Sequence, residues 1–375
     1  MARLDKICSL NMGQSPDSSS YNENGNGMPF FQGNADFGKI HPRVRVWCSA
    51  PTKIAHTGDV LISVRAPIGA LNIADRECCI GRGLAALTVN EELCNKDYLW
   101  YAITSKVDEL NSKGTGSTFK AISKNVLAET EIPLPDLNEQ KIVAKRLSKI
   151  DELIAMRKEQ LTKLDQLVKS RFIELFGDSV TNSMGWVTDT VIGVCDDIYG
   201  GGTPSKSHPE YYENGDIPWV SSKDMKTDVL YDSQIKINQL GVDNSTAKMV
   251  PINSVIMVIR SGILKHTLPV AVNAVPITVN QDLKVFIPSN RILSIFLMHQ
   301  FKMLEKDILS GVRAVTADNI EFDSLKKREI IVPPMELQER FAAFVKQTDK
   351  SKLVIQQSLN KLELLNKSLM QEYFG

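Results

Sequence analysis

The sequence predicts an α+β fold: two globular α/β domains separated by a pair of long antiparallel coiled-coil helices, with an internal pseudo-two-fold repeat. Three observations lead to this prediction. Shifted by 198 residues, 131–177 falls on 329–375 without a gap, and 15 of the 47 positions are identical. Within each copy a long stretch lacks proline and glycine, and short β-type runs fill the segments outside the copies.

Each copy of the repeat predicts a strand end followed by one long helix. The copies open with "EIPLPDLNEQ" and "EIIVPPMELQER", whose prolines end a strand and permit a helix just beyond. Nearly 40 residues follow, enough for a helix of roughly 60 Å. Apolar side chains recur at alternating spacings of three and four, so each helix needs a partner. The seam positions are Leu147, Ile150, Ile154, Leu161, Leu164, Val168 and Leu175, then Val345, Thr348, Ile355, Leu359, Leu362, Leu369 and Tyr373.

The rest of the chain forms two domains with the same order of landmarks. Both carry strand-like runs, then one helix, a loop and the proline lead-in. "GQSP" and "DVLISVR" in the first correspond to "GGTP" and "SVIMVIR" in the second. We therefore predict globular domains at 1–130 and 179–328, and spacer helices at 131–178 and 329–375. The polar exceptions on the seam, Arg157 and Arg171, face either the partner helix or another subunit.

Composition narrows the class of protein. The chain has 375 residues, and 44 Lys and Arg balance 44 Asp and Glu, so any nucleic-acid binding must use local patches. It has no apolar run of 18 residues and no leader-like start, which predicts a cytoplasmic protein. The six cysteines lack metal-ligand spacing and are expected to be reduced, buried thiols.

No enzyme motif is apparent. "VPPM" differs from an adenine-methyltransferase tetrapeptide at both ends, and the Gly-rich "YGGGTP" and "GTGST" lack the lysine of a P-loop. The five histidines are scattered. We therefore expect a non-catalytic chain that holds no metal and no cofactor of its own.

The two long helices are more similar in sequence to each other than the two globular domains are. This suggests that the domains recognise different ligand features, while the helices contact the same partner. DNA with two half-sites is one such ligand. Basic residues cluster in 37–82 and in 244–281, where they can neutralise phosphates or read base edges. The alternative is ordinary solvated surface.

The pattern "GSTFKAIS…EIPLPDLNEQKIVAKRL", its long helix ending "FIELFGD" and the second copy ending "SLMQEYF" resembles the specificity (S) subunit of type I restriction-modification systems. The resemblance covers the whole chain and implies two target recognition domains, each reading half of a bipartite DNA target. It also implies that the helices set the spacer and dock two methyltransferase (M) subunits, which use S-adenosylmethionine. Restriction (R) subunits, using ATP and Mg²⁺, would complete the complex.

These readings give two sets of candidate residues. For DNA contact they are Arg43, Arg45, Lys53, Arg65, Arg82 and Lys120 in the first domain, and Lys206, Lys223, Arg260, Lys265 and Arg313 in the second. For Arg65 and Arg260 the alternative is a structural salt bridge. Gln140 and Gln338 are candidates for contact with M subunits, or else for a helix N-terminal hydrogen bond. The rival functions are a coiled-coil scaffold with protein-binding heads and the specificity subunit of a type IIG-like system.

Overall fold

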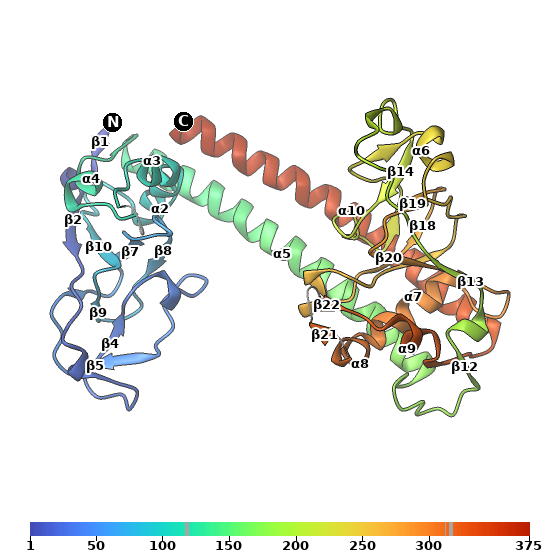
Figure 1. The fold of residues 1–375 in the computed structure, drawn as a ribbon. Coiled ribbons are helices and arrows are strands. Elements are labelled where there is room, and N and C mark those ends of the chain that lie inside the picture. Colours follow the sequence, from blue (N-terminus) through green and yellow to red (C-terminus); the bar gives the residue numbers. More distant parts are fainter. Residues whose placement is uncertain (117–119, 312, 315–317) are drawn as a thin grey trace. The chain divides into compact units, whose positions relative to one another are not determined.

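The computed structural model describes residues 1–116, 120–311, 313–314 and 318–375. The chain forms two compact units (Figure 1). Unit 1 comprises residues 1–159 and 356–375, and unit 2 comprises residues 160–355. In the described ranges no helix combines the length and the apolar character that crossing a bilayer requires.

Unit 1 contains two sheets. An antiparallel sheet has the order β2-β10-β7-β8, and a mixed sheet has the order β3-β5-β4-β9-β6. Their strands are β2 (Cys8–Met12), β3 (Tyr21–Asn22), β4 (Met28–Phe31), β5 (Val46–Cys48), β6 (Ile54–Ala55), β7 (Val60–Ser63), β8 (Leu71–Ile73), β9 (Cys78–Ile80) and β10 (Leu84–Val89).

Helices and a short ribbon complete unit 1. The helices are α1 (Leu4–Ile7), α2 (Lys96–Ser105), α3 (Val107–Ser112) and α4 (Lys124–Ala128), and β1 (Ala2–Arg3) pairs with β11 (Glu131–Ile132). Asn95 starts α2, because its side chain accepts a hydrogen bond from Tyr98 N. The buried side chains of α2 share one core with the first turns of the long helix that follows.

Unit 2 also contains two larger sheets. Its sheets have the orders β13-β20-β17-β18-β15 and β16-β14-β19, with two-stranded pairs β12-β23 and β21-β22. The strands are β12 (Thr188–Thr190), β13 (Cys195–Gly200), β14 (Ile217–Val220), β15 (Val229–Leu230), β16 (Lys236–Ile237), β17 (Val255–Val258), β18 (Val270–Asn273), β19 (Thr278–Val279), β20 (Leu283–Pro288), β21 (Arg313–Ala314), β22 (Asp318–Asn319) and β23 (Glu329–Ile331). The helices are α6 (Gln239–Asp243), α7 (Ser294–Met303), α8 (Glu305–Ser310) and α9 (Phe322–Lys326).

The two long helices are α5 (Leu137–Phe176) and α10 (Met335–Phe374), each of 40 residues (Figure 1). They begin six residues into the predicted helical segments, because the lead-ins form β11, β23 and a proline turn. The Asp136 carboxylate accepts from Asn138 N and Glu139 N and so caps α5. Gly177, with a φ of 74°, ends it.

The predicted seam positions are all buried or half-buried. Within unit 1, α10 contacts the first half of α5: Asn366 Nδ2 donates to Asp151 Oδ1 at 2.7 Å, and Arg146 Nη1 donates to the Tyr373 hydroxyl at 3.0 Å. Within unit 2, Lys352 pairs with Asp165 at 2.7 Å, and the Arg171 guanidinium lies 5.7 Å from the Phe344 ring centroid. Arg171 therefore packs on the second long helix.

Candidate nucleic-acid interface

A tight turn stands at the same place in both units. It links β9 to β10 at 81–84 and β19 to β20 at 280–283, and its last amide donates to its first carbonyl at 3.0 and 3.3 Å respectively. The second residue of each turn is exposed: Arg82 in unit 1 and Gln281 in unit 2. Each turn therefore presents one long polar side chain to solvent.

The "GQSP" and "GGTP" motifs pack against these turns. A Cβ on Gly13 would lie 2.2 Å from Gly81 O, and one on Gly201 would lie 2.0 Å from Val279 O, so only glycine fits. The motif hydroxyl reaches the turn in both units. Ser15 Oγ accepts from Arg82 N at 3.3 Å, and Thr203 Oγ1 donates to Gln281 Oε1.

The surrounding backbone has the same hydrogen-bond register in both units. Each unit 1 bond has a unit 2 counterpart of nearly the same length. The pairs are Gln14 N to Ile80 O and Gly202 N to Val279 O (3.0 and 3.0 Å), Gly81 N to Phe31 O and Asn280 N to Val220 O (2.8 and 2.9 Å), Val64 N to Gly83 O and Ile259 N to Asp282 O (2.9 and 2.9 Å), and Ile122 N to Val64 O and Ile320 N to Ile259 O (2.9 and 2.9 Å).

This register brings four of the predicted DNA contacts in unit 1 to one sheet edge. Val64 bonds the turn and places Arg65 beside it, and Ala66 N donates to Lys120 O at 2.9 Å. On the other side Ile80 N donates to Lys53 O at 2.8 Å. All four side chains are exposed, and within the described residues none of them forms an ion pair. We call this set edge 1: Lys53, Arg65, Arg82 and Lys120, with Ser15 and Gln32.

Arg43 and Arg45 flank edge 1, and both bond to Asp36, Arg45 at the carboxylate and Arg43 at the backbone carbonyl. Arg45 Nη2 lies 2.5 Å from Asp36 Oδ1, and Arg43 N donates to Asp36 O at 2.8 Å. The buried Asp36 also accepts from Gln32 N at 2.8 Å, and Gln32 O accepts from Gly83 N. All six basic residues predicted in the first domain thus belong to one hydrogen-bonded region.

The corresponding set in unit 2, edge 2, consists of Thr203, Ser221, Lys248, Arg260 and Gln281. Lys248 matches Lys53, because Val250 bridges Ile277 as Ala55 bridges Cys78. Its ammonium lies 5.5 Å from the Tyr199 ring centroid. Arg260 pairs with Asp282 at 2.6 Å, whereas glycine stands there in unit 1. The salt-bridge alternative therefore holds for Arg260, but Arg65 makes no such pair in the described residues.

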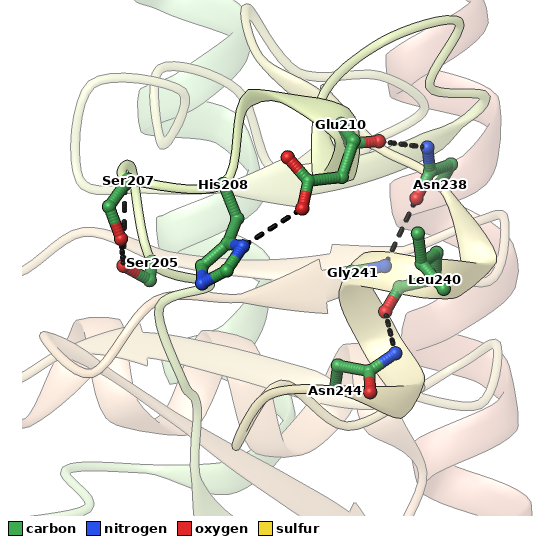
Figure 2. A network of polar contacts seen from close by, with 8 residues as sticks. All are labelled: Ser205, Ser207, His208, Glu210, Asn238, Leu240, Gly241 and Asn244. Carbon is green, nitrogen blue, oxygen red and sulfur yellow. Dashed lines mark hydrogen bonds and ion pairs between the residues drawn. The ribbon is translucent and has the colours of Figure 1, made fainter.

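Lys206 lies in the loop that leaves Thr203, between Ser205 and Ser207, which are drawn in Figure 2. Ser205 Oγ and Ser207 Oγ are 2.6 Å apart on either side of it, and His208 Nδ1 lies 2.8 Å from Glu210 Oε1. The His208 hydrogen bond lowers the pKa of the Glu210 carboxyl. Asn238 Nδ2 donates to Glu210 O at 2.7 Å, which ties the loop to the start of α6.

The other predicted residues of the second domain are spread around edge 2. Lys223 is exposed in a turn that Asp224 closes by accepting from Ser221 N at 2.9 Å, as Asp36 does for Gln32. Lys265 ends a short 3-10 helix, Gly262–Lys265. Arg313 pairs through its backbone with Asn319, which also bridges Arg260, and the Arg313 side chain lies outside the described residues.

The side chains of Gln140 and Gln338, predicted either to contact another subunit or to make a helix N-terminal hydrogen bond, are both fully buried within this chain. Gln140 Oε1 accepts from Asn95 N at 2.7 Å, and Nε2 donates to Leu93 O and Pro135 O. Gln338 makes the same three bonds, each shifted by 198 residues, with Leu293 N, Arg291 O and Pro333 O. Each amide therefore ties a long helix to the helix of its own domain.

Lys248 and Gln281 are not among the DNA contacts that the sequence predicts. Lys248 was part of a basic cluster, but only the strand register shows that it matches Lys53. Gln281 carries no charge, so a search for cations passes over it. The signal that finds it is its offset of 199 residues from Arg82, one more than the offset of the repeat.

No metal centre occurs in the parts of the chain that the structure describes, because no three potential ligands gather there. All six cysteines are free thiols. Burial raises the pKa of Cys78 and of Cys94 to about 12, so these thiols stay protonated at neutral pH.

A family model described as the type I restriction modification DNA specificity domain matches residues 1–166 and 184–364. The chain belongs to this family. Two specificity subunits are similar to it in sequence. A putative type I restriction enzyme MjaX subunit of Methanocaldococcus jannaschii is 43% identical over 165 residues, and the EcoR124I/EcoR124II subunit of Escherichia coli is 32% identical over 223 residues.

These matches cover parts of the chains. They span 44% and 58% of this chain, and 39% and 55% of the two relatives. A crystal structure of the type I S subunit from M. genitalium aligns over 100% of this chain and 95% of its own, with a TM-score of 0.63 and 16% identity. At that identity the likeness concerns the fold alone.

Proposed function

We propose that this chain is the DNA sequence-recognition subunit of a type I restriction-modification complex. Each globular domain reads one half of a bipartite target, the first with edge 1 and the second with edge 2. The observation that carries the proposal is the shared register of the two edges. The two domains differ in sequence, yet both hold exposed cations, a turn-tip side chain and a hydroxyl at equivalent backbone positions. This arrangement is expected if both domains bind the same DNA duplex, each at its own half-site.

In this proposal α5 and α10 form an antiparallel coiled-coil pair that sets the spacer, and the chain has a pseudo-two-fold repeat. The helix contacts found inside unit 1 support it, since the paired positions rise along α5 while they fall along α10. The domain limits proposed are 1–130, 131–178, 179–328 and 329–375. The repeat gives two copies of one partner equivalent surfaces.

The partners in the proposal are double-stranded DNA, two methyltransferase (M) subunits and restriction (R) subunits. S-adenosylmethionine, ATP and Mg²⁺ serve those subunits, and this chain contributes recognition without chemistry of its own. The exposed apolar residues Met156 and Val354, which match under the 198-residue shift, offer M subunits equivalent contacts.

The test is to co-purify the chain with its cognate M subunits and to map methylated sites on random-sequence DNA. We expect one bipartite motif with a fixed gap, and replacement of 1–130 by another such domain should change one half only. A complex that assembles but methylates no defined motif would refute the proposal. A chain that binds proteins and no DNA with or without M subunits would favour the scaffold.

A further inference from the structure

We infer that Arg82 and Gln281, the tips of the two equivalent turns, are base-reading residues, so that edge 1 selects a guanine where edge 2 selects an adenine. The inference rests on the proposed function and adds to it the chemical identity of one base in each half-site.

Arg82 and Gln281 occupy equivalent positions in the two units. Each is the second residue of a closed four-residue turn that enters an inner strand of its sheet, β10 or β20. The glycine of the motif packs against each turn at the closest approach that backbone allows. A residue at either position therefore leaves the same point of the fold.

Some side chains are the same in edge 1 and edge 2, and others are replaced. Lys53 and Lys248 are both lysines, and the motif hydroxyl is kept as Ser15 or Thr203, whereas Arg260, unlike its counterpart Arg65, is paired with Asp282. Cations that stay the same in two domains of different sequence suit the phosphates, which are the same at every base pair. The turn tip changes from a guanidinium to an amide, and beside it Gln32 is replaced by Ser221.

The hydrogen-bonding groups of Arg82 and Gln281 match different bases. An arginine can donate two hydrogen bonds to guanine O6 and N7, and a glutamine can exchange two with adenine N6 and N7 in the major groove. Arg82 has no carboxylate partner in the described residues, so its donors are available. Gln281 Oε1 accepts from the Thr203 hydroxyl, which orients the amide and leaves the Nε2 donors and one Oε1 lone pair.

The experiment uses the whole complex with M subunits and DNA libraries in which each position of both half-sites is randomised. The wild type must first give a bipartite motif; if it gives none, the proposed function fails and the inference is not reached. Gln281→Arg is then expected to change one position of one half from adenine to guanine, and Arg82→Gln to make the reverse change in the other half. Each preference should amount to about 5- to 150-fold.

Lys53→Ala and Lys248→Ala are the matched controls. They should weaken binding to all sequences alike and flatten its salt dependence, with the motif unchanged. If the complex with Gln281→Arg binds no DNA, the complex with Gln281→Ala provides the test. It is expected to accept all four bases at one position of the half-site. An unchanged motif in Gln281→Arg, or an equal loss on every sequence in both Gln281 variants, would overturn the inference.

Discussion

In each unit a long helix packs against its globular domain in a region that we call the joint, and the three hydrogen bonds of the one buried glutamine there form its polar clamp. The joints of units 1 and 2 differ in their apolar packing but not in this clamp. Gln140 and Gln338 make the same three bonds, with no exchange of partner type. Around them the side chains diverge. In unit 2 the rings of Phe172, Phe176, Phe296 and Phe341 have centroids 4.8–5.7 Å apart. In unit 1 the same four positions hold Met370, Phe374, Tyr98 and Val143, with one ring contact at 5.2 Å.

This difference shows which part of the joint is fixed by the backbone. Buried amide and carbonyl groups must keep their partners, because an unsatisfied one costs about 1–3 kcal/mol. Apolar side chains can exchange as long as the volume is filled. A duplicated joint can therefore change its core while its clamp stays the same.

The largest effect is expected from Phe172→Ala. The side chain is fully buried among three rings, so its loss should lower the free energy of unfolding of unit 2 by about 4 kcal/mol. Hydrogen exchange of the α7 amides, read by mass spectrometry, measures this locally.

The matched variant is Met370→Ala, at the same position of unit 1. Met370 is half-buried, so the loss there should be about 1–2 kcal/mol and should show in α2 rather than α7. Equal losses in the two units would contradict the difference in packing.

A smaller and equal effect is expected from Gln140→Ala and Gln338→Ala. Each leaves one amide and two carbonyls without their partner, which should cost about 3 kcal/mol in the corresponding unit. Urea unfolding with local exchange measures it. Gln356→Ala, on an exposed position of α10, is the control and should change stability by less than about 0.5 kcal/mol. An effect in one unit alone would show that the clamps are not equivalent.

The sequence already contains the repeat, the two helices and the seam, because these follow from local pattern and a fixed offset. It does not contain the role of Gln140, since a glutamine in a first helical turn reads as a cap. Gln140 is buried against Asn95, which lies 45 residues earlier in the chain. Periodicity likewise cannot show that Phe172 faces a domain, because it marks an apolar face without naming its partner. Arg82 stands out by its charge, while Gln281 is identified only by its equivalence to Arg82.

A pH effect from a buried histidine is expected in unit 2. His299 is buried, and burial, aided by Lys302 and Lys352 and opposed by Asp228, holds its pKa well below the ordinary 6.5. The unfolded chain takes up a proton below pH 6.5 that the folded chain refuses, so stability is present above that pH and falls below it. The slope is at most about 1.4 kcal/mol per pH unit.

Between pH 7.5 and 5.5 the resulting loss should be about 1 kcal/mol, measured by urea unfolding and exchange in α7. His299→Gln should remove that part of the slope, while the other charged groups contribute equally to both proteins. Unit 1 has Tyr101 at this position, donating to Asp151 at 2.9 Å, and should show no such slope in α2. An unchanged slope in His299→Gln would assign the pH dependence to other groups.

The smallest effect is expected from Lys158→Gln, which places on α5 the residue that the second copy of the repeat has at the matching position, Gln356. Lys158 pairs with Glu363 at 2.9 Å, but the two side chains are 59% and 47% exposed. Water and salt screen such a pair, so the free energy of unfolding should change by less than about 0.5 kcal/mol. Lys352→Gln is the comparison, because Lys352 is only 21% exposed and serves both Asp165 and Asp349. Its loss should exceed that of Lys158→Gln in urea unfolding, and the reverse order would mean that exposure does not govern these ion pairs.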